Sequence, residues 1–391
     1  MKDSYYSKTH RITYVHRRTQ SSKPYNILAA IITVTAVCTV VLLFAVQRKN
    51  SRQLSDLNST KGKGLKMISL DACAMEGEMG AGKLMVSDIS EILVGNPWKE
   101  SDGIGALPVF QVRRGYDACE LPSQRMTAEQ MRSEMDRMTK ALGIQNSKVK
   151  EETLKEQFPK CGYEFKDTDV YRMTVSSGDT TITIRCDGKE CIEQKKSSPD
   201  GFTGKKSISN PDDAQKVLEA YYDKYKKLCP FLTPVYSVEP DNDGNLEFSG
   251  NVYEGEGGLR EQILSYNFNR ISFQERKGTL YITMEQKHLD THYMGEYPLI
   301  TVVEAEWMLH HGYYISSCKT KNKFSGEAEK VELVYLTDGN ISYDVPYYCF
   351  YVKSSSPKSK NVQVYEEYYV PAIEPQYIDC DLLWDTNKSQ I

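Results

Sequence analysis

The stretch YRMTVSSGDTTITIRC, Tyr171–Cys186, decides the fold class of this chain. Apolar side chains recur at every second position on both sides of its Ser-Ser-Gly-Asp turn, at Tyr171, Met173, Val175, Ile182, Ile184 and Cys186. This alternation predicts two antiparallel strands joined by a hairpin. The same pattern recurs around the turns at Arg276–Gly278 and Asp338–Gly339, so we expect antiparallel sheets through the rest of the chain.

Three helices are predicted around these strands. Thr127–Gly143 begins with a capping-box pair and ends at a glycine, and Thr301–Gly312 has the same signals. Asn210–Leu228 begins with an Asn-Pro pair followed by two aspartates, which suits a helix N-terminus. Because helices and strands do not alternate strictly, the fold class is α+β, with helices packed on antiparallel sheets.

A transmembrane helix is predicted at residues 25–47. Ile27–Val46 carries no charged residue and, at about 1.5 Å per residue, spans a hydrocarbon core of about 30 Å. A cleaved signal peptide is the alternative, but the run is long for one and no small-x-small cleavage site follows. Both flanks of the span are basic, so orientation is inferred from length: a short basic tail stays cytoplasmic, and a long folded domain is carried across.

The resulting topology is a single-pass cell-membrane protein with a cytoplasmic N-terminus and an extracytoplasmic C-terminal domain. Because the part after residue 66 is acidic, nucleic-acid binding is not expected. The predicted boundaries are 1–24 for the tail, 48–66 for a juxtamembrane linker, 67–165 for a first α+β region, and 166–290 and 291–391 for two helix-plus-meander modules. The shared order of a helix followed by a meander suggests that these two modules are related.

The chain has ten cysteines, and Cys38 falls within the predicted span. The remaining nine cannot all pair. Cys186 and Cys191 bracket an Asp-Gly turn and are close enough in sequence for a bridge across a hairpin, but no CxxC motif occurs. Scattered buried thiols are therefore the favoured interpretation, since a body this long can build a core without disulfides.

No motif indicates a catalytic, cofactor or metal site. GEMGAGKL, Gly77–Leu84, resembles a phosphate-binding loop but has Leu84 where a hydroxyl must hold magnesium. His288 and His292 lack the glutamate of a zinc-protease helix, and His310 and His311 point in different directions on a helix. The loop at Glu239–Gly250 lacks the last carboxylate of a calcium loop.

Tyrosine is unusually frequent, with 27 in the chain. Alternating tyrosines suit half-buried strands, but they also suit an aromatic recognition surface, because tyrosine offers a large contact area at low entropy cost. The candidate recognition residues are Tyr343, Tyr347, Tyr348, Tyr351, Tyr365, Tyr368 and Tyr369.

The C-terminal part also carries a family resemblance, in Tyr297–Tyr314, Val331–Leu336, Asp344–Val352 and Tyr368–Ile373. These segments resemble helix-then-meander modules of the membrane-anchored, extracytoplasmic YycH/YycI-like regulatory proteins of Gram-positive bacteria. The likeness covers about the last 180 residues and carries over no functional residue. It implies one membrane span, tandem α+β modules outside the membrane and a regulatory role.

We therefore expect a membrane-anchored extracytoplasmic binding or regulatory protein without catalytic activity, whose partner is another membrane or cell-envelope protein. The alternative is an extracytoplasmic envelope-acting enzyme that uses dispersed carboxylates. A pocket with convergent carboxylates of raised pKa would favour the enzyme, and an exposed aromatic groove would favour binding.

Overall fold

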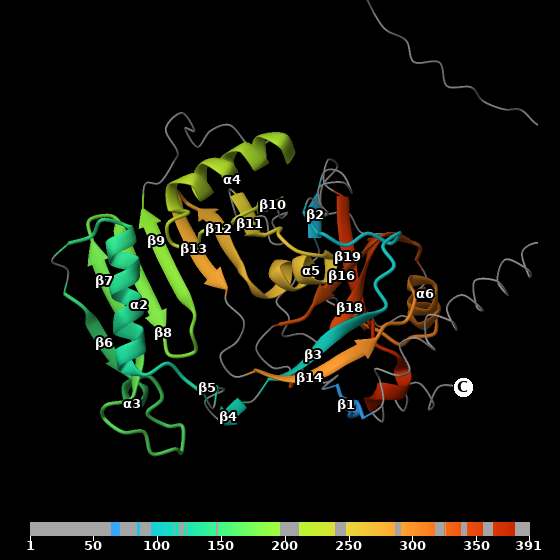
Figure 1. Ribbon diagram of the computed structural model, residues 1–391, viewed down its shortest axis with the longest axis horizontal. Helices are drawn as coiled ribbons and strands as arrows, with labels where there is room; N and C mark the ends of the chain where they lie inside the picture. The colour runs from blue at the N-terminus through green and yellow to red at the C-terminus, as the bar shows by residue number, and fades with distance from the viewer. Residues whose placement is uncertain are drawn as a thin grey trace, which may run out of the picture. The chain divides into compact units, whose positions relative to one another are not determined.

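Figure 1 shows the computed structural model of the chain, which describes residues 64–70, 84–86, 95–112, 114–116, 121–122, 124–145, 148–195, 211–238, 248–285, 291–316, 324, 326–337, 342–354 and 363–379. These residues belong to one compact unit, Asn58–Ile391. None of the helices among them is long and apolar enough to cross a membrane. The predicted span, the glycines of the phosphate-loop-like motif, the calcium-like loop before Phe248, Asn210 and His288 lie outside the described residues.

An eight-stranded sheet forms from the middle of the chain. In spatial order its strands are β10 (Pro234–Val238), β11 (Phe248–Glu254), β12 (Arg270–Arg276), β13 (Thr279–Glu285), β9 (Glu190–Lys195), β8 (Thr180–Arg185), β7 (Val170–Ser177) and β6 (Lys150–Thr153). All neighbours are antiparallel. The predicted hairpin is confirmed as β7 and β8, and Gly178 at its turn has φ +57°, which favours glycine.

Two helices cover this sheet and share one hydrophobic core with it. Helix α2 (Ala128–Ala141) has the predicted capping box between Thr127 and Gln130, and Met131, Met135 and Met138 are buried. Helix α4 (Pro211–Tyr225) buries one apolar face at helical spacing, which consists of Ala214, Val217, Leu218, Tyr221, Tyr225 and, just beyond its end, Leu228. A short helix, α3 (Leu154–Gln157), follows β6.

The C-terminal part builds smaller sheets. One contains β14 (Thr291–Pro298), β3 (Ala106–Val112) and β17 (Tyr343–Asp344). Another contains β15 (Ile315–Ser316), β19 (Gln363–Pro371), β18 (Pro346–Lys353) and β16 (Ala328–Tyr335), with β2 (Leu84–Val86) also pairing with β19. Two-stranded pairs join β1 (Ile68–Ser69) to β20 (Ile378–Asp379) and β4 (Arg114–Tyr116) to β5 (Leu121–Pro122).

Both faces of the β16–β18–β19 sheet are buried. One face of β18 carries Tyr347, Cys349 and Tyr351 into a core shared with β1 and β20. The other carries Tyr348, Phe350 and Val352 into a core shared with α5 (Leu259–Phe268) and α6 (Val302–His310). Helix α6 has the predicted capping box between Thr301 and Glu304, and a 3-10 turn, Pro375–Tyr377, precedes β20.

The predicted α+β class and its antiparallel sheets are confirmed. Residues of the predicted first region, 67–165, contribute strands to several sheets: β1 pairs with β20, β3 with β14, and β6 with β7. The predicted domain boundaries, and the kinship of the two helix-plus-meander modules, stay predictions.

Candidate binding cleft

The tyrosines predicted as a recognition surface lie inside the protein. Tyr347, Tyr348, Tyr351, Tyr365, Tyr368 and Tyr369 are buried, and Tyr343 is half-buried. Several of their hydroxyls donate to acceptors of the same chain: Tyr348 to the carbonyl of Ile300, Tyr351 to Glu332, Tyr365 to the exposed Glu329, Tyr368 to Glu366 and Tyr369 to Glu367. The six buried tyrosines therefore do not form the expected exposed aromatic surface, because both faces of their sheet are covered, and Tyr343 lies on β17 in another sheet.

Two of these acceptors form a buried polar cluster with Cys349. Glu332 and Tyr369 lie opposite Cys349 on the two strands that flank β18, and Glu367 is 6% exposed. Burial raises the pKa of Glu367 to about 7, although the hydrogen bond from Tyr369 acts in the opposite direction and lowers it. Burial also raises the pKa of the Cys349 thiol well above its usual value, so this thiol is not poised as a nucleophile.

A cleft of about 460 Å³ opens on the other face, between β16, α6 and the segment Gly95–Glu100. Its walls include five apolar side chains, Trp98, Val302, Ala328, Val331 and Phe350, and the charged residues around it are Lys99, Glu100, Glu306, Glu329 and Lys330. Glu332 also contributes to the lining, but its side chain is buried and accepts a hydrogen bond from Tyr351. An apolar interior with a charged rim is typical of a binding site. We call this the binding cleft.

The outer side of β16 faces this cleft. Strand β16 is the last in its sheet, and among the described strands it pairs only with β18. The backbone N–H of Tyr335 and the carbonyl of Leu333 point away from β18, because they bond to Asn267 and Asn96. Since outward and inward groups alternate along an antiparallel strand, the N–H and C=O of Val331 also point outward. No described residue bonds to them.

Hydrogen bonds and close packing fix the position of the segment Gly95–Glu100, which forms one wall of the cleft. Asn96 donates to Leu333 and accepts from the backbone N–H of Trp98 over 3.0 Å. Gly95 has φ +107°, and a Cβ there would come within 2.5 Å of Ser237, so only glycine fits. Trp98 is 5% exposed, packs 5.6 Å from Tyr348 between ring centroids, and its indole N–H has no partner among the described residues.

Helix α6 presents a second apolar stripe next to the cleft. Its buried side is formed by Ala305, Met308 and Leu309, whereas Val303 is 61% exposed and Trp307 is 55% exposed. The rings of Trp307 and His311 are stacked, with 3.9 Å between their centroids. Nδ1 of His311 lies 2.7 Å from the carbonyl oxygen of Trp307. The ring of His310 instead contacts Phe324, so the two histidines point in different directions as predicted.

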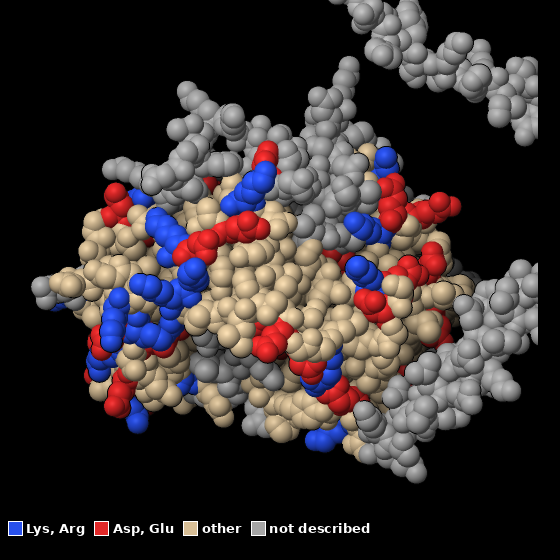
Figure 2. Space-filling model, turned by 45° about the horizontal axis from the view of Figure 1, so that its top comes forward, with Lys and Arg blue, Asp and Glu red and all other residues tan. Residues whose placement is uncertain are grey.

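Acidic side chains predominate near the cleft. Among the described residues in view, Figure 2 shows more Asp and Glu than Lys and Arg on the right, the side that carries α6 and β16 in Figure 1. Glu100 and Glu306 make no ion pair with a described residue. The described residues hold no group of three His, Cys, Asp or Glu side chains that could bind a metal, and His292 lies on β14.

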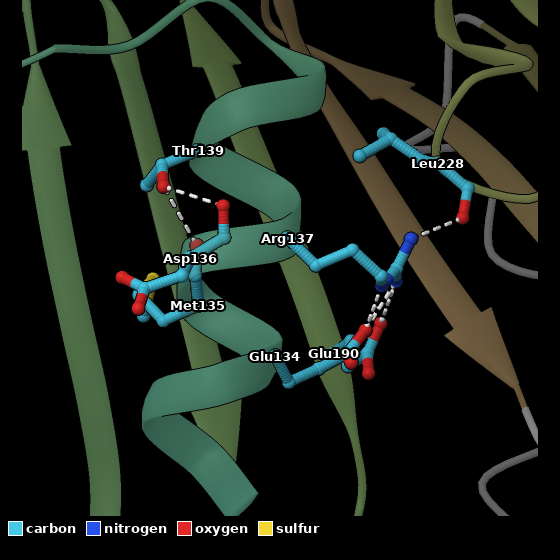
Figure 3. A network of polar contacts seen from close by, with 7 residues as sticks. All are labelled: Glu134, Met135, Asp136, Arg137, Thr139, Glu190 and Leu228. Atoms are coloured by element: carbon cyan, nitrogen blue, oxygen red, sulfur yellow. Dashed lines mark hydrogen bonds and ion pairs between the residues drawn. The ribbon is translucent and has the colours of Figure 1, made fainter.

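A second cluster of charged groups lies under α2. Figure 3 shows the carboxylates of Glu134 and Glu190 side by side against the guanidinium of Arg137, which also donates to the carbonyl of Leu228 over 2.7 Å. Burial, the charge of Glu134 and a hydrogen bond to it raise the pKa of Glu190 to about 8, and Arg137 opposes the shift. Nearby Cys229 has its thiol pKa raised to about 11 by burial.

Four of the described cysteines are free thiols, in line with the favoured interpretation of scattered thiols, and one is disulfide-bonded. Cys186 and Cys191 are free, as are Cys229 and Cys349. Cys161 is disulfide-bonded, and its partner lies outside the described residues, because every other described cysteine is free. The bridge between Cys186 and Cys191 considered from the sequence is therefore not formed.

No protein-family model matches this chain, and no curated protein matches its sequence. The residues of the cleft consequently carry the functional argument alone. Sequence reasoning missed Trp98, Trp307 and Val331. The signal for Trp307 was present, since Val303 and Trp307 are four residues apart on the helix side opposite its buried residues.

Proposed function

We propose that this chain is a single-pass, membrane-anchored extracytoplasmic protein that binds and regulates a partner protein without catalysing a reaction. The observation that carries the proposal is the binding cleft, with its apolar walls, the side of β16 at Val331 that pairs with no described strand, and the exposed Trp307 beside it. Exposed tryptophan next to an apolar depression is typical of protein interfaces, where Trp, Tyr and Arg supply most of the binding energy.

Two features support the extracytoplasmic location. The sequence of Ile27–Val46 is that of a membrane span with a short basic tail before it. The disulfide of Cys161 lies in the part of the chain that follows the span, and such bonds persist mainly in oxidising compartments. A protease added to intact cells should therefore digest residues 67–391; complete protection of these residues would overturn the orientation.

The resemblance to YycH/YycI-like regulators supports a regulatory role and a partner in the membrane or cell envelope. We also propose that the two helix-plus-meander modules, 166–290 and 291–391, are related, because each contains a helix followed by a meander. In this arrangement the extracytoplasmic part senses or holds the partner, and the span places it beside a membrane protein.

Site-specific cross-linking in the native membrane tests the proposal. A photo-reactive amino acid replaces Glu329, an exposed residue of the cleft, in the full-length chain. The matched control places it at Tyr163, which is 49% exposed near α3. We expect one defined cross-linked protein from position 329 and none from position 163. Equal products from both positions, or none from position 329, would refute the cleft as a partner site.

The pair Glu134–Glu190 favours a second candidate, an extracytoplasmic enzyme acting on envelope material. A carboxyl group with a pKa near 8 beside a second carboxyl group is an arrangement that general acid and base catalysis can use. The full-length protein would then release soluble fragments from purified cell walls, and Glu190→Gln would abolish that release. If wild-type protein releases nothing, the Glu134–Glu190 pair is a structural contact.

A further inference from the structure

We infer that the occupant of the binding cleft is an extended segment of the partner polypeptide that carries a Lys or Arg side chain and adds to the outer side of β16 at Val331. This inference rests on the proposed function, because it specifies the chemistry of the partner at the same site. It is carried by the backbone of β16, the lining of the cleft and the charges around it.

The backbone defines where such a segment binds. Two backbone groups on the outer side of β16 are already hydrogen-bonded: the N–H of Tyr335 donates to Asn267, and the carbonyl of Leu333 accepts from Asn96. Val331 is the next residue whose N–H and C=O face outward, and both are unbonded within the described part of the chain. A register shift between Ala328 and Lys330 ends the regular edge there. The open edge therefore suits a short segment of a few residues in extended conformation.

The lining suits the alternating side chains of such a segment. Successive side chains of a strand point to opposite sides, so one residue of the segment would face Val331, Phe350 and Trp98 while its neighbours face the rim and solvent. The floor is apolar and takes an aliphatic or aromatic side chain.

The charges determine which segment is preferred. Glu306 and Glu100 on the rim have no ion-pair partner among the described residues, and Glu304 adds a further carboxylate one turn from the exposed ring of Trp307. The positive charges of Lys99 and Lys330 offset the negative charge of these carboxylates only in part. A cationic side chain is therefore attracted to the acidic rim, and it can also lie over the Trp307 ring.

The test uses the full-length chain in lipid nanodiscs and a phage-displayed library of random octapeptides. We expect the selected peptides to combine apolar residues with Lys or Arg. Val331→Pro removes only the outward N–H and no bond to β18, and proline is tolerated at such an edge position. It should weaken the selected peptides about tenfold or more. The matched control, Val331→Thr, keeps the N–H and the branched shape and should bind within about twofold.

Two exposed variants test the charge without touching the strand. Glu306→Lys should weaken peptide binding severalfold, Lys99→Glu should strengthen it, and both effects should shrink in high salt. Selection of acidic peptides, or equal binding by Val331→Pro and Val331→Thr, would overturn the inference. The proposed function is judged separately: if position 329 still cross-links its partner equally in the Val331→Pro chain, the cleft binds a partner but not by strand addition.

Discussion

The side-chain oxygen of Asn267 accepts a hydrogen bond from the backbone N–H of Tyr335 over 2.9 Å, which ties α5 to the outer side of β16. Asn96 makes a longer contact, 3.4 Å, with the carbonyl of Leu333 on the same side. An unpaired strand edge is a template for further pairing, and these two asparagines close part of it. What they leave open is Val331, in the wall of the cleft.

These two contacts should differ in their effect on stability. Asn267 is buried and also donates to the carbonyl of Ile263, so Asn267→Ala leaves buried polar groups unpaired and should cost about 2–3 kcal/mol. Asn96 is half-buried with a long bond, and Asn96→Ala should cost less than about 1 kcal/mol. Urea unfolding of the full-length chain in detergent measures both; a larger loss for Asn96→Ala would contradict the assignment.

Glu190 should make the protein less stable as pH rises. Its pKa is raised to about 8 in the folded state from an ordinary 4.5, so between these values the folded chain holds a proton that the unfolded chain has lost. Unfolding then releases a proton, and stability falls by up to about 1.4 kcal/mol per pH unit in that window. Glu190→Gln should flatten this slope when melting temperature is followed from pH 5 to pH 8.

The control for that experiment is Glu193→Gln, on the same strand as Glu190 and half-buried. It should leave the slope unchanged. A wild-type protein whose melting temperature rises from pH 5 to pH 8, with Glu190→Gln behaving identically, would mean that Glu190 is ionised in the folded state.

The disulfide of Cys161 should be measurable as a response to reductant. Reduction should lower the melting temperature, because a native disulfide contributes about 2–4 kcal/mol. Cys161→Ser should be destabilised and no longer respond to reductant. Cys191→Ser, which replaces a free half-buried thiol, should respond as the wild type does. Peptide mapping without reduction would identify the partner, and a free Cys161 in that map would refute the bond.

The buried tyrosines should affect stability but not binding. Tyr369→Phe removes the hydrogen bond to the buried carboxylate of Glu367, so it should destabilise the protein by about 1–3 kcal/mol above pH 7, where that carboxylate is ionised. The yield of cross-linked partner from position 329 should not change. A lost cross-link at unchanged stability would restore these tyrosines as recognition residues.

Local chemistry explains which parts of the fold were predictable. The capping boxes at Thr127 and Thr301 and the glycine turn at Gly178 are determined by residues within a few positions, and the structure has each of them. Met131, Met135 and Met138 recur at helical spacing, which places them on one face, and the structure buries all three.

The tyrosine clusters were ambiguous for a physical reason. Period-two alternation indicates a strand and its two faces, but not what covers each face. In β18 one face is covered by elements around β1 and β20, and the other by α5 and α6, all distant in sequence. The cleft was not predictable either, because it brings Trp98, Val331 and α6 together through tertiary contacts that no local pattern records.

The measurement that tests the central claim most directly compares two exposed apolar residues in the native membrane. Trp307 lies beside the cleft, and Leu232, 81% exposed, follows α4. Leu232→Ala should leave the melting temperature unchanged, and Trp307→Ala should lower it modestly because the indole ring stacks on His311, so cross-linking is compared at a temperature at which both variants are folded. We expect Trp307→Ala to reduce cross-linking of the partner from position 329 about tenfold and Leu232→Ala to leave it unchanged. An undiminished cross-link in Trp307→Ala, or an equal loss in both variants, would contradict the account.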